Sequence, residues 1–224
     1  MSSFIVASIG EWNKEIFNLV SKKLNGSWYF ASSPDELNEL IENVSPRYIF
    51  FPHWRWVVPK VILNEYECVC FHMTDVPYGR GGSPLQNLIV RGHKDTVLTA
   101  LRMEEGLDTG PVYYKKTLSL SGSAHDIYQR AAELSWEMIS DFIKKEPQPR
   151  PQKGEPVVFK RRNSDDSKIP VGLNLEQFYD YIRMLDAPDY PYAFIEYGDL
   201  CLEFNQAEFN GNELIASVKI TTKD

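Results

Sequence analysis

The chain has 224 residues, 43% hydrophobic and 25% charged, which is ordinary for a globular protein of one full domain with a small addition. Its formal net charge of −7 argues against a nucleic-acid partner, since phosphate binding needs a basic face, although a local basic patch could still hold a diphosphate. Its apolar runs are too short for a membrane span and its first ten residues do not resemble a secretory signal, so we expect a cytoplasmic protein.

The cysteines number three, Cys68, Cys70 and Cys201, and none of their spacings suits a metal ion. We therefore expect reduced thiols, no structural disulfide and no metal site.

Strand-like and helix-like segments alternate through the first half of the chain. Ser33, Pro34 and Glu36 together form an N-terminal helix signal. This order predicts an open, mostly parallel, Rossmann-like α/β sheet covered by helices. The turn at 8–11 lacks the glycine pattern of a dinucleotide site. The segments are strands at 4–8, 28–31, 47–51 and 67–71, and helices at 12–24 and from 34 onward.

Later segments predict the domain organisation. A Gly/Pro-rich loop at 73–82 precedes a short helix at 84–90, strands at 96–103 and 112–118, and a long helix that begins after Ser123. Asn210-Gly211 is a strong hairpin signal that follows a helix at 175–185. We expect a main domain over 1–150, a linker over 151–172, and a small C-terminal α+β module over 173–224 that packs on the main domain.

His72 closes an apolar strand and opens the Gly/Pro loop. That position is the carboxyl edge of the sheet, where open α/β folds bind ligands, and an imidazole there can exchange a proton near neutral pH. Taken alone, His72 is better explained as a polar strand end that makes one backbone hydrogen bond.

The surrounding residues favour a catalytic role. Residues 72–81, HMTDVPYGRG, resemble the H-x-[ST]-x-x-P-x-x-R-G loop of the folate-dependent formyltransferases, and 82–86, GSPLQ, resemble the helix start that follows it. Residues 106–110, GLDTG, match a second loop of that family, and Asp108 lies 36 positions after His72, as the family spacing requires. Both motifs at this spacing identify the formyltransferase fold.

The resemblance continues outside these loops. Pro59-Lys60 is similar to a turn of the methionyl-tRNA formyltransferases, and 181–194 are similar to the entry of their C-terminal module. The resemblance implies that N10-formyltetrahydrofolate supplies a formyl group to a primary amine, without a metal. His72 would face the developing oxyanion, and Asp108 would tune His72 and assist removal of the amine proton.

Cys70 departs from the family pattern, which has Asn two residues before the His. A thiol is a poorer donor than an amide, and loss of one oxyanion donor typically costs about 10²–10³ in rate. The role of Cys70 is therefore open, and a catalytically impaired module that binds folate or a nucleotide sugar is the alternative to an enzyme.

The sequence also indicates binding residues. The aromatic side chains at 53–56, beside Arg55, could hold a nucleotide base and phosphate or a pterin ring, although the tryptophans could equally cap the core. The expected folate residues are Met73, Thr74, Pro77, Arg80, Gly81, Gly82, Leu101, Arg102 and Leu107, and the expected acceptor residues are His53, Trp54, Trp56 and Gln86.

Three acceptors are considered: initiator methionyl-tRNA, a purine precursor such as glycinamide ribonucleotide, and an amino sugar carried on a nucleotide. The acidic balance and the absence of a basic insertion between 31 and 33 disfavour tRNA. The C-terminal appendix disfavours the purine enzyme. By elimination we expect a nucleotide-sugar substrate and greatest similarity to the nucleotide-sugar N-formyltransferases, and the family resemblance allows a homodimer.

Overall fold

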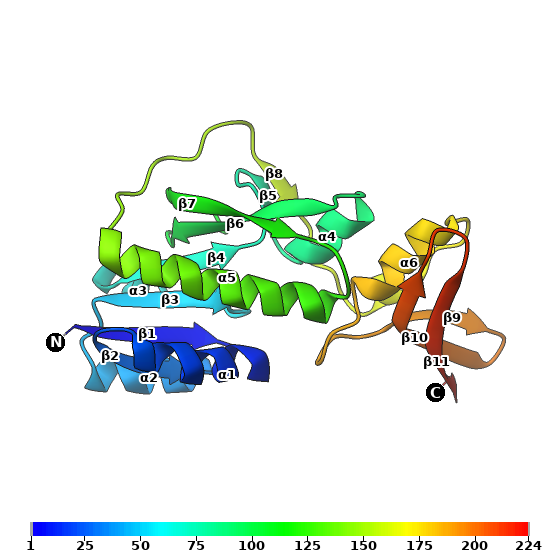
Figure 1. Ribbon diagram of the computed structural model, residues 1–224, viewed down its shortest axis with the longest axis horizontal. Coiled ribbons are helices and arrows are strands. Elements are labelled where there is room, and N and C mark those ends of the chain that lie inside the picture. The colour runs from blue at the N-terminus through cyan, green and yellow to red at the C-terminus, as the bar shows by residue number, and fades with distance from the viewer. Residues whose placement is uncertain (1, 224) are drawn as a thin grey trace. The chain divides into compact units, whose positions relative to one another are not determined.

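The computed structural model describes residues 2–223, which form two compact units (Figure 1). The first unit comprises the chain up to residue 81 together with 96–118 and 129–158. The second comprises 82–95, 119–128 and the chain from 159 onward. Each unit is described by itself.

A six-stranded sheet forms the centre of the first unit, with strand order β2-β1-β3-β4-β6-β7. The strands β1 to β4 are parallel, and β6 runs antiparallel to β4. The predicted open, mostly parallel sheet is therefore confirmed. The strands are β1 (Ser3–Ser8), β2 (Ser27–Ala31), β3 (Tyr48–His53), β4 (Glu67–His72), β6 (Asp95–Arg102) and β7 (Val112–Ser119).

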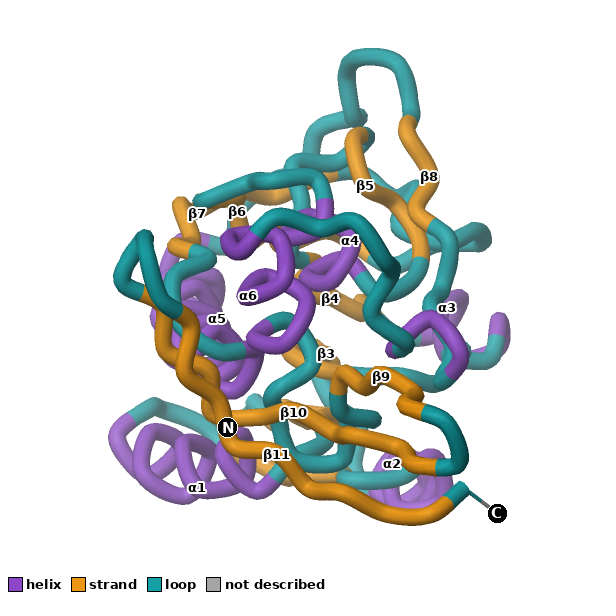
Figure 2. The backbone as a smooth tube through the Cα atoms, turned by 90° about the vertical axis from the view of Figure 1, so that its right-hand side faces the viewer, coloured by secondary structure: helices purple, strands orange, loops and turns teal. Residues whose placement is uncertain are grey.

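Helices cover both faces of this sheet (Figures 1 and 2). The helices α1 (Glu11–Val20) and α5 (Ala124–Lys145) lie on one face, and α2 (Pro34–Asn43) and α3 (Lys60–Glu65) on the other. Phe50 and Phe142 meet edge to face, 5.6 Å between ring centroids, beneath α5. The other face buries an aliphatic cluster that includes Ile5, Ile49 and Ile62. Because successive strand residues alternate between faces, each strand contributes to both cores.

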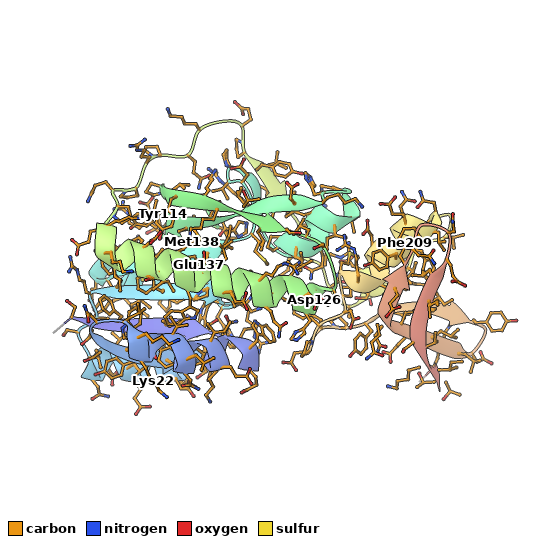
Figure 3. The ribbon with its side chains drawn as sticks, viewed as in Figure 1. Lys22, Tyr114, Asp126, Glu137, Met138 and Phe209 are labelled. Atoms are coloured by element: carbon orange, nitrogen blue, oxygen red, sulfur yellow. The ribbon has the colours of Figure 1, made fainter. Side chains whose placement is uncertain are left out.

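Side chains of β7 and α5 also make polar contacts. The Tyr114 hydroxyl donates a hydrogen bond to the Met138 carbonyl, and the side chains of both labelled residues can be followed in Figure 3. Lys116 pairs with Glu137 at 3.2 Å. The first contact is part-buried and the second is exposed, and both join β7 to α5.

The hydrogen bonds at the start of α2 differ in one respect from the capping box predicted from Ser33 and Glu36. The Ser33 hydroxyl accepts from the Glu36 backbone N–H, as expected. The Glu36 carboxylate, however, accepts from the backbone N–H and hydroxyl of Ser32 at 2.6 and 2.7 Å, so the reciprocal bond is displaced by one residue. The Ser33 hydroxyl therefore still caps the first turn of α2, although Glu36 bonds to Ser32 instead of Ser33.

Two short strands were not predicted from the sequence. The strand β5 (Tyr78–Gly81) lies inside the predicted loop at 73–82, and it pairs with β8 (Val157–Phe159) in the expected linker. The residues between α5 and β8 are otherwise irregular.

The second unit contains α4 (Pro84–Val90), α6 (Leu175–Arg183) and an antiparallel sheet of β9 (Ala193–Tyr197), β10 (Leu200–Phe209) and β11 (Leu214–Thr222). The predicted Asn210-Gly211 hairpin joins β10 to β11. Arg183 is 4% exposed, and its charge is neutralised by Asp180 at 2.6 Å. None of the helices within residues 2–223 is long and apolar enough to cross a membrane.

Candidate active site

His72 lies at the end of β4 and is only 9% exposed. Its Nε2 lies 2.8 Å from the Gly79 carbonyl oxygen, which can only accept, so Nε2 carries a hydrogen. The same carbonyl accepts from the Thr74 hydroxyl at 3.1 Å. The loop after β4 therefore turns back and fixes both the orientation and the tautomer of the imidazole.

Asp108 approaches the other side of this ring. Its Oδ1 lies 3.5 Å from His72 Nδ1, and its Oδ2 accepts from the Gly81 backbone N–H at 2.9 Å. An imidazolium would present an N–H from Nδ1 to the carboxylate, whereas the neutral tautomer fixed by Gly79 would present a lone pair. The carboxylate therefore lies where it can accept from an Nδ1–H whenever the ring carries one.

Cys70 lies two residues before His72, so its side chain points to the same face of β4, where it packs against the aliphatic cluster. Burial raises the pKa of the Cys70 thiol well above its usual value, and the Asp108 charge raises it further. The thiol is thus protonated at neutral pH. This state argues against a nucleophilic role for Cys70.

The other expected folate residues of this unit lie on the loop after His72, on β6 and on the loop that follows β6. The Met73 carbonyl accepts from the Thr96 hydroxyl at 3.2 Å, and Arg80 bonds to the Gln152 side chain rather than projecting freely. Pro77 follows a cis peptide bond. Leu101 is buried on β6 opposite Cys70, Arg102 pairs with Glu104 at 2.7 Å, and Leu107 is 68% exposed.

A groove of about 440 Å³ borders the segment that begins at Arg102. One wall is formed by 102–105 and the other by 63–67. Its volume lies in the range of small-molecule sites. A second groove of about 480 Å³, between α1 and α5, contains none of the predicted site residues.

The expected acceptor residues at 53–56 form an aromatic cluster. The Trp54 and Trp56 rings meet edge to face at 4.8 Å, and the Arg55 guanidinium lies 4.7 Å from the centroid of Trp56. Trp54 also packs on Phe51. Since neighbours already occupy these rings, the cluster agrees with the core-capping alternative at least as well as with base stacking.

His53 lies at the end of β3, and its ring packs against Trp12. Burial, together with the charge of Arg55, lowers the pKa of His53 to about 4. His53 is therefore a neutral imidazole at neutral pH.

This neutral histidine makes acid stability testable. The unfolded chain takes up a proton at His53 near pH 6.5, whereas the folded chain resists until about pH 4, so the free energy of unfolding should fall as pH drops between these values. The loss should reach about 3 kcal/mol at most. Urea unfolding at several pH values should show a flatter dependence for His53→Gln than for the wild type. Parallel curves would rule out this contribution.

Gly82 and Gln86 belong to the second unit. A Cβ on Gly82 would lie 2.7 Å from the Arg161 Cα, so close packing already explains this glycine. Gln86 is 3% exposed, and its amide hydrogens reach the Tyr128 hydroxyl and the Met184 carbonyl, both at 3.1 Å. These bonds argue against the substrate role expected for Gln86.

Two residues at the site escaped the sequence analysis. Gly79 supplies the carbonyl that orients His72, and Gln152 bonds to Arg80 and to the backbone around Asp108. Neither carries a signal in a single sequence, because a backbone carbonyl has no residue signature and Gln152 stands alone in an irregular segment.

Within residues 2–223 no cluster of His, Cys, Asp and Glu side chains could hold a metal ion. The site is thus an imidazole and a carboxylate in contact at the carboxyl edge of an open α/β sheet, an arrangement suited to acid–base and oxyanion chemistry.

Comparison with known proteins identifies the family. Residues 12–143 match the Formyl transferase family, and residues 164–221 match the C-terminal domain of methionyl-tRNA formyltransferase. The first match spans more than half of the chain, which therefore belongs to the formyl transferase family. Its members are folate-dependent enzymes.

The more similar relatives are named as methionyl-tRNA formyltransferases. A structure from Clostridium thermocellum is 42% identical with a TM-score of 0.96, and the match covers 100% of both chains. The protein from Clostridium perfringens is 28% identical over 81% of this chain and 61% of its own length. The chain thus spans about 60% of the length of the first curated relatives it matches.

More distant structures share the fold. HypX from Aquifex aeolicus, solved in complex with tetrahydrofolic acid, is 16% identical with a TM-score of 0.74 over 91% of this chain and 37% of its own. A 4-N formyltransferase from Francisella tularensis is 15% identical with a TM-score of 0.66 over 88% and 93%. The expected greatest similarity to nucleotide-sugar enzymes is therefore wrong, since the relatives named for methionyl-tRNA are closer in sequence.

Proposed function

We propose that this protein transfers a formyl group from N10-formyltetrahydrofolate to a primary amine, with His72 and Asp108 as its catalytic residues. The observation that carries the proposal is their contact, 3.5 Å between Nδ1 and Oδ1, at the carboxyl edge of a formyltransferase sheet. Two loops 36 residues apart in sequence meet there, in the spacing of the family motifs.

The folate supplies an activated formyl carbon. A buried, positively charged His72 would stabilise negative charge that develops on the formyl oxygen, since electrostatic effects are strong where water is excluded. Asp108 would hold His72 in this form and take up a proton from the attacking amine. Cys70, protonated and beside them, would contribute a weak S–H donor in place of the amide of the family Asn.

The chemistry of the backbone suits a folate. Backbone N–H and C=O groups of 101–107 offer the donors and acceptors that a pterin ring needs. The groove beside 102–105 borders Glu67 at the start of β4, whereas His72 lies at the end of that strand, so this groove alone does not place a folate at the imidazole. The binding of tetrahydrofolic acid by HypX, a protein of the same fold, adds support. We propose that the folate lies along 101–107 and the loop at 73–82.

For the acceptor we propose a small amine, an amino sugar linked to a nucleotide, rather than an aminoacyl-tRNA. Residues 173–224 contain ten acidic and three basic residues, whereas the remaining 21 acidic and 21 basic residues lie in 1–172. A module with a formal charge of −7 would repel a polynucleotide backbone. A diphosphate needs only a few cations, such as the run Lys160-Arg161-Arg162.

The names of the closer relatives favour the other acceptor, methionyl-tRNA, and an assay decides between them. The purified protein would be given N10-formyltetrahydrofolate with nucleotide-linked 3- and 4-aminohexoses, glycinamide ribonucleotide or methionyl-tRNA. We expect formylation of one of the sugars. Formylation of methionyl-tRNA alone would overturn the acceptor, and folate binding without transfer to any amine would indicate a binding module instead of an enzyme.

A further inference from the structure

Gln152 joins three parts of the site. Its Nε2 donates to the carbonyl oxygens of Asp108 and Gly110 at 2.7 and 2.8 Å. Its Oε1 accepts from Nε and Nη2 of Arg80 at 3.1 and 2.8 Å. A single side chain thus connects the loop that carries Asp108 with the strand that follows His72.

The chemistry of the partners fixes the orientation of this amide. The two carbonyls can only accept and the guanidinium can only donate, so the NH2 group must face the Asp108 loop and the oxygen must face Arg80. Both amide hydrogens and the amide oxygen are used. No other arrangement of Gln152 satisfies all three partners.

Asp108 needs such support because its backbone has φ of 53°, in the left-handed region that is strained for residues other than glycine. Its carboxylate reaches His72 only while the peptide that follows keeps its present orientation. The Gln152 amide holds that peptide by its carbonyl oxygen, and holds Gly110 two residues later in the same way.

The chain on either side of Gln152 is anchored to the same region. Arg150 forms a backbone bridge with Val112, and the Val157 N–H donates to the Pro77 carbonyl at 3.0 Å. Gln152 is half-buried, whereas its neighbours Pro151 and Lys153 are exposed. This segment is therefore attached at both ends and contributes one inward side chain between them.

We propose that Gln152 is a positioning residue for formyl transfer, and that it acts by holding the Asp108 carboxylate against His72. This inference rests on the proposed function of the pair. It assigns to Gln152 no contact with the folate or the amine.

The test compares Gln152→Leu and Gln152→Glu with the wild type. Leu removes all four hydrogen bonds, whereas Glu keeps an oxygen for Arg80 but places a second oxygen against two carbonyls. If the N–H donors are what matters, both variants should lose about 10- to 100-fold in kcat, with a much smaller change in KM for the folate. Gln148→Leu, an exposed glutamine of the same segment, is the matched control and should keep full activity.

A second measurement does not depend on turnover. The chain has four histidines, so the ring signals of His72 can be assigned by NMR with single His→Gln variants. Gln152→Leu should shift the His72 signals in the same direction as Asp108→Asn, and Gln148→Leu should not. Unchanged His72 signals and unchanged kcat in both Gln152 variants would overturn the proposal. If the wild type transfers no formyl group, the proposed function fails, and the NMR comparison still decides whether Gln152 positions Asp108.

Discussion

Asp108→Asn should reduce kcat for formyl transfer by about 10²–10⁴-fold, the usual contribution of a positioned acid–base group. The substitution removes the negative charge that faces His72 Nδ1 and the proton acceptor for the amine. The Asn oxygen can still accept from the Gly81 N–H, so the loop should keep its place and the melting temperature should change little. His72→Asn should cause a similar loss, and the double variant should be no worse than the more damaged single variant, because the two side chains act as one unit.

A matched control is available in the same loop region. Asp75 is a carboxylate on the loop after His72, its side chain is 67% exposed, and its partner is Lys115. Asp75→Asn should leave kcat within about threefold, since exposed ion pairs contribute little. An Asp108→Asn enzyme as active as this control would remove Asp108 from the mechanism.

Gly110→Ala should damage both folding and activity. A Cβ at this position would lie 1.8 Å from the Arg102 carbonyl oxygen, a backbone atom that cannot rotate away. The loop must shift to relieve this contact, and such overpacking typically costs about 1–3 kcal/mol. Asp108 lies two residues earlier, so a shift of about 1 Å would also lower kcat by about 10²-fold. Urea unfolding and the formyl-transfer assay measure the two effects separately.

The control for Gly110→Ala is Gly172→Ala. A Cβ on Gly172 meets no atom within 4 Å, but its φ of 90° strains any larger residue. This variant should lose about 1 kcal/mol through the backbone alone and keep its activity. If Gly110→Ala is equally stable and fully active, the close approach of the loop to Arg102 is not required.

The main elements could be predicted because each depends on local patterns. The buried strands are apolar runs, and the helix starts at Ser33 and Ser123 carry capping signals. The contact of His72 with Asp108 followed from family motifs rather than from physics, since nothing local to either residue shows that they meet. By contrast, β5 and β8 have four and three residues, too few to show a period, and they form only because they pair with each other.

The expected ligand residues show the limits of a motif. Gln86 and Arg80 lie inside family motifs, yet their side chains form hydrogen bonds to neighbouring parts of the protein. A motif shows which residue type occupies a position, but not whether that residue contacts a ligand or holds neighbouring segments of the protein. The folded structure distinguishes these two roles.

The antiparallel direction of β6 restricts insertions and deletions in the loop that carries Asp108. Thr99 lies opposite His72 and Arg102 lies opposite Val69, so β6 carries the chain about 10 Å away from the imidazole before it turns. The loop must return over that distance within the eight residues that separate Arg102 from Pro111, whose backbones are joined at 2.9 Å. Surface loops usually accept insertions, but one added or deleted residue here would redirect the carboxylate. Homologues that use the same His–Asp pair should therefore differ in length in other loops. A homologue whose loop between these two strands is longer or shorter should lack the pair's activity.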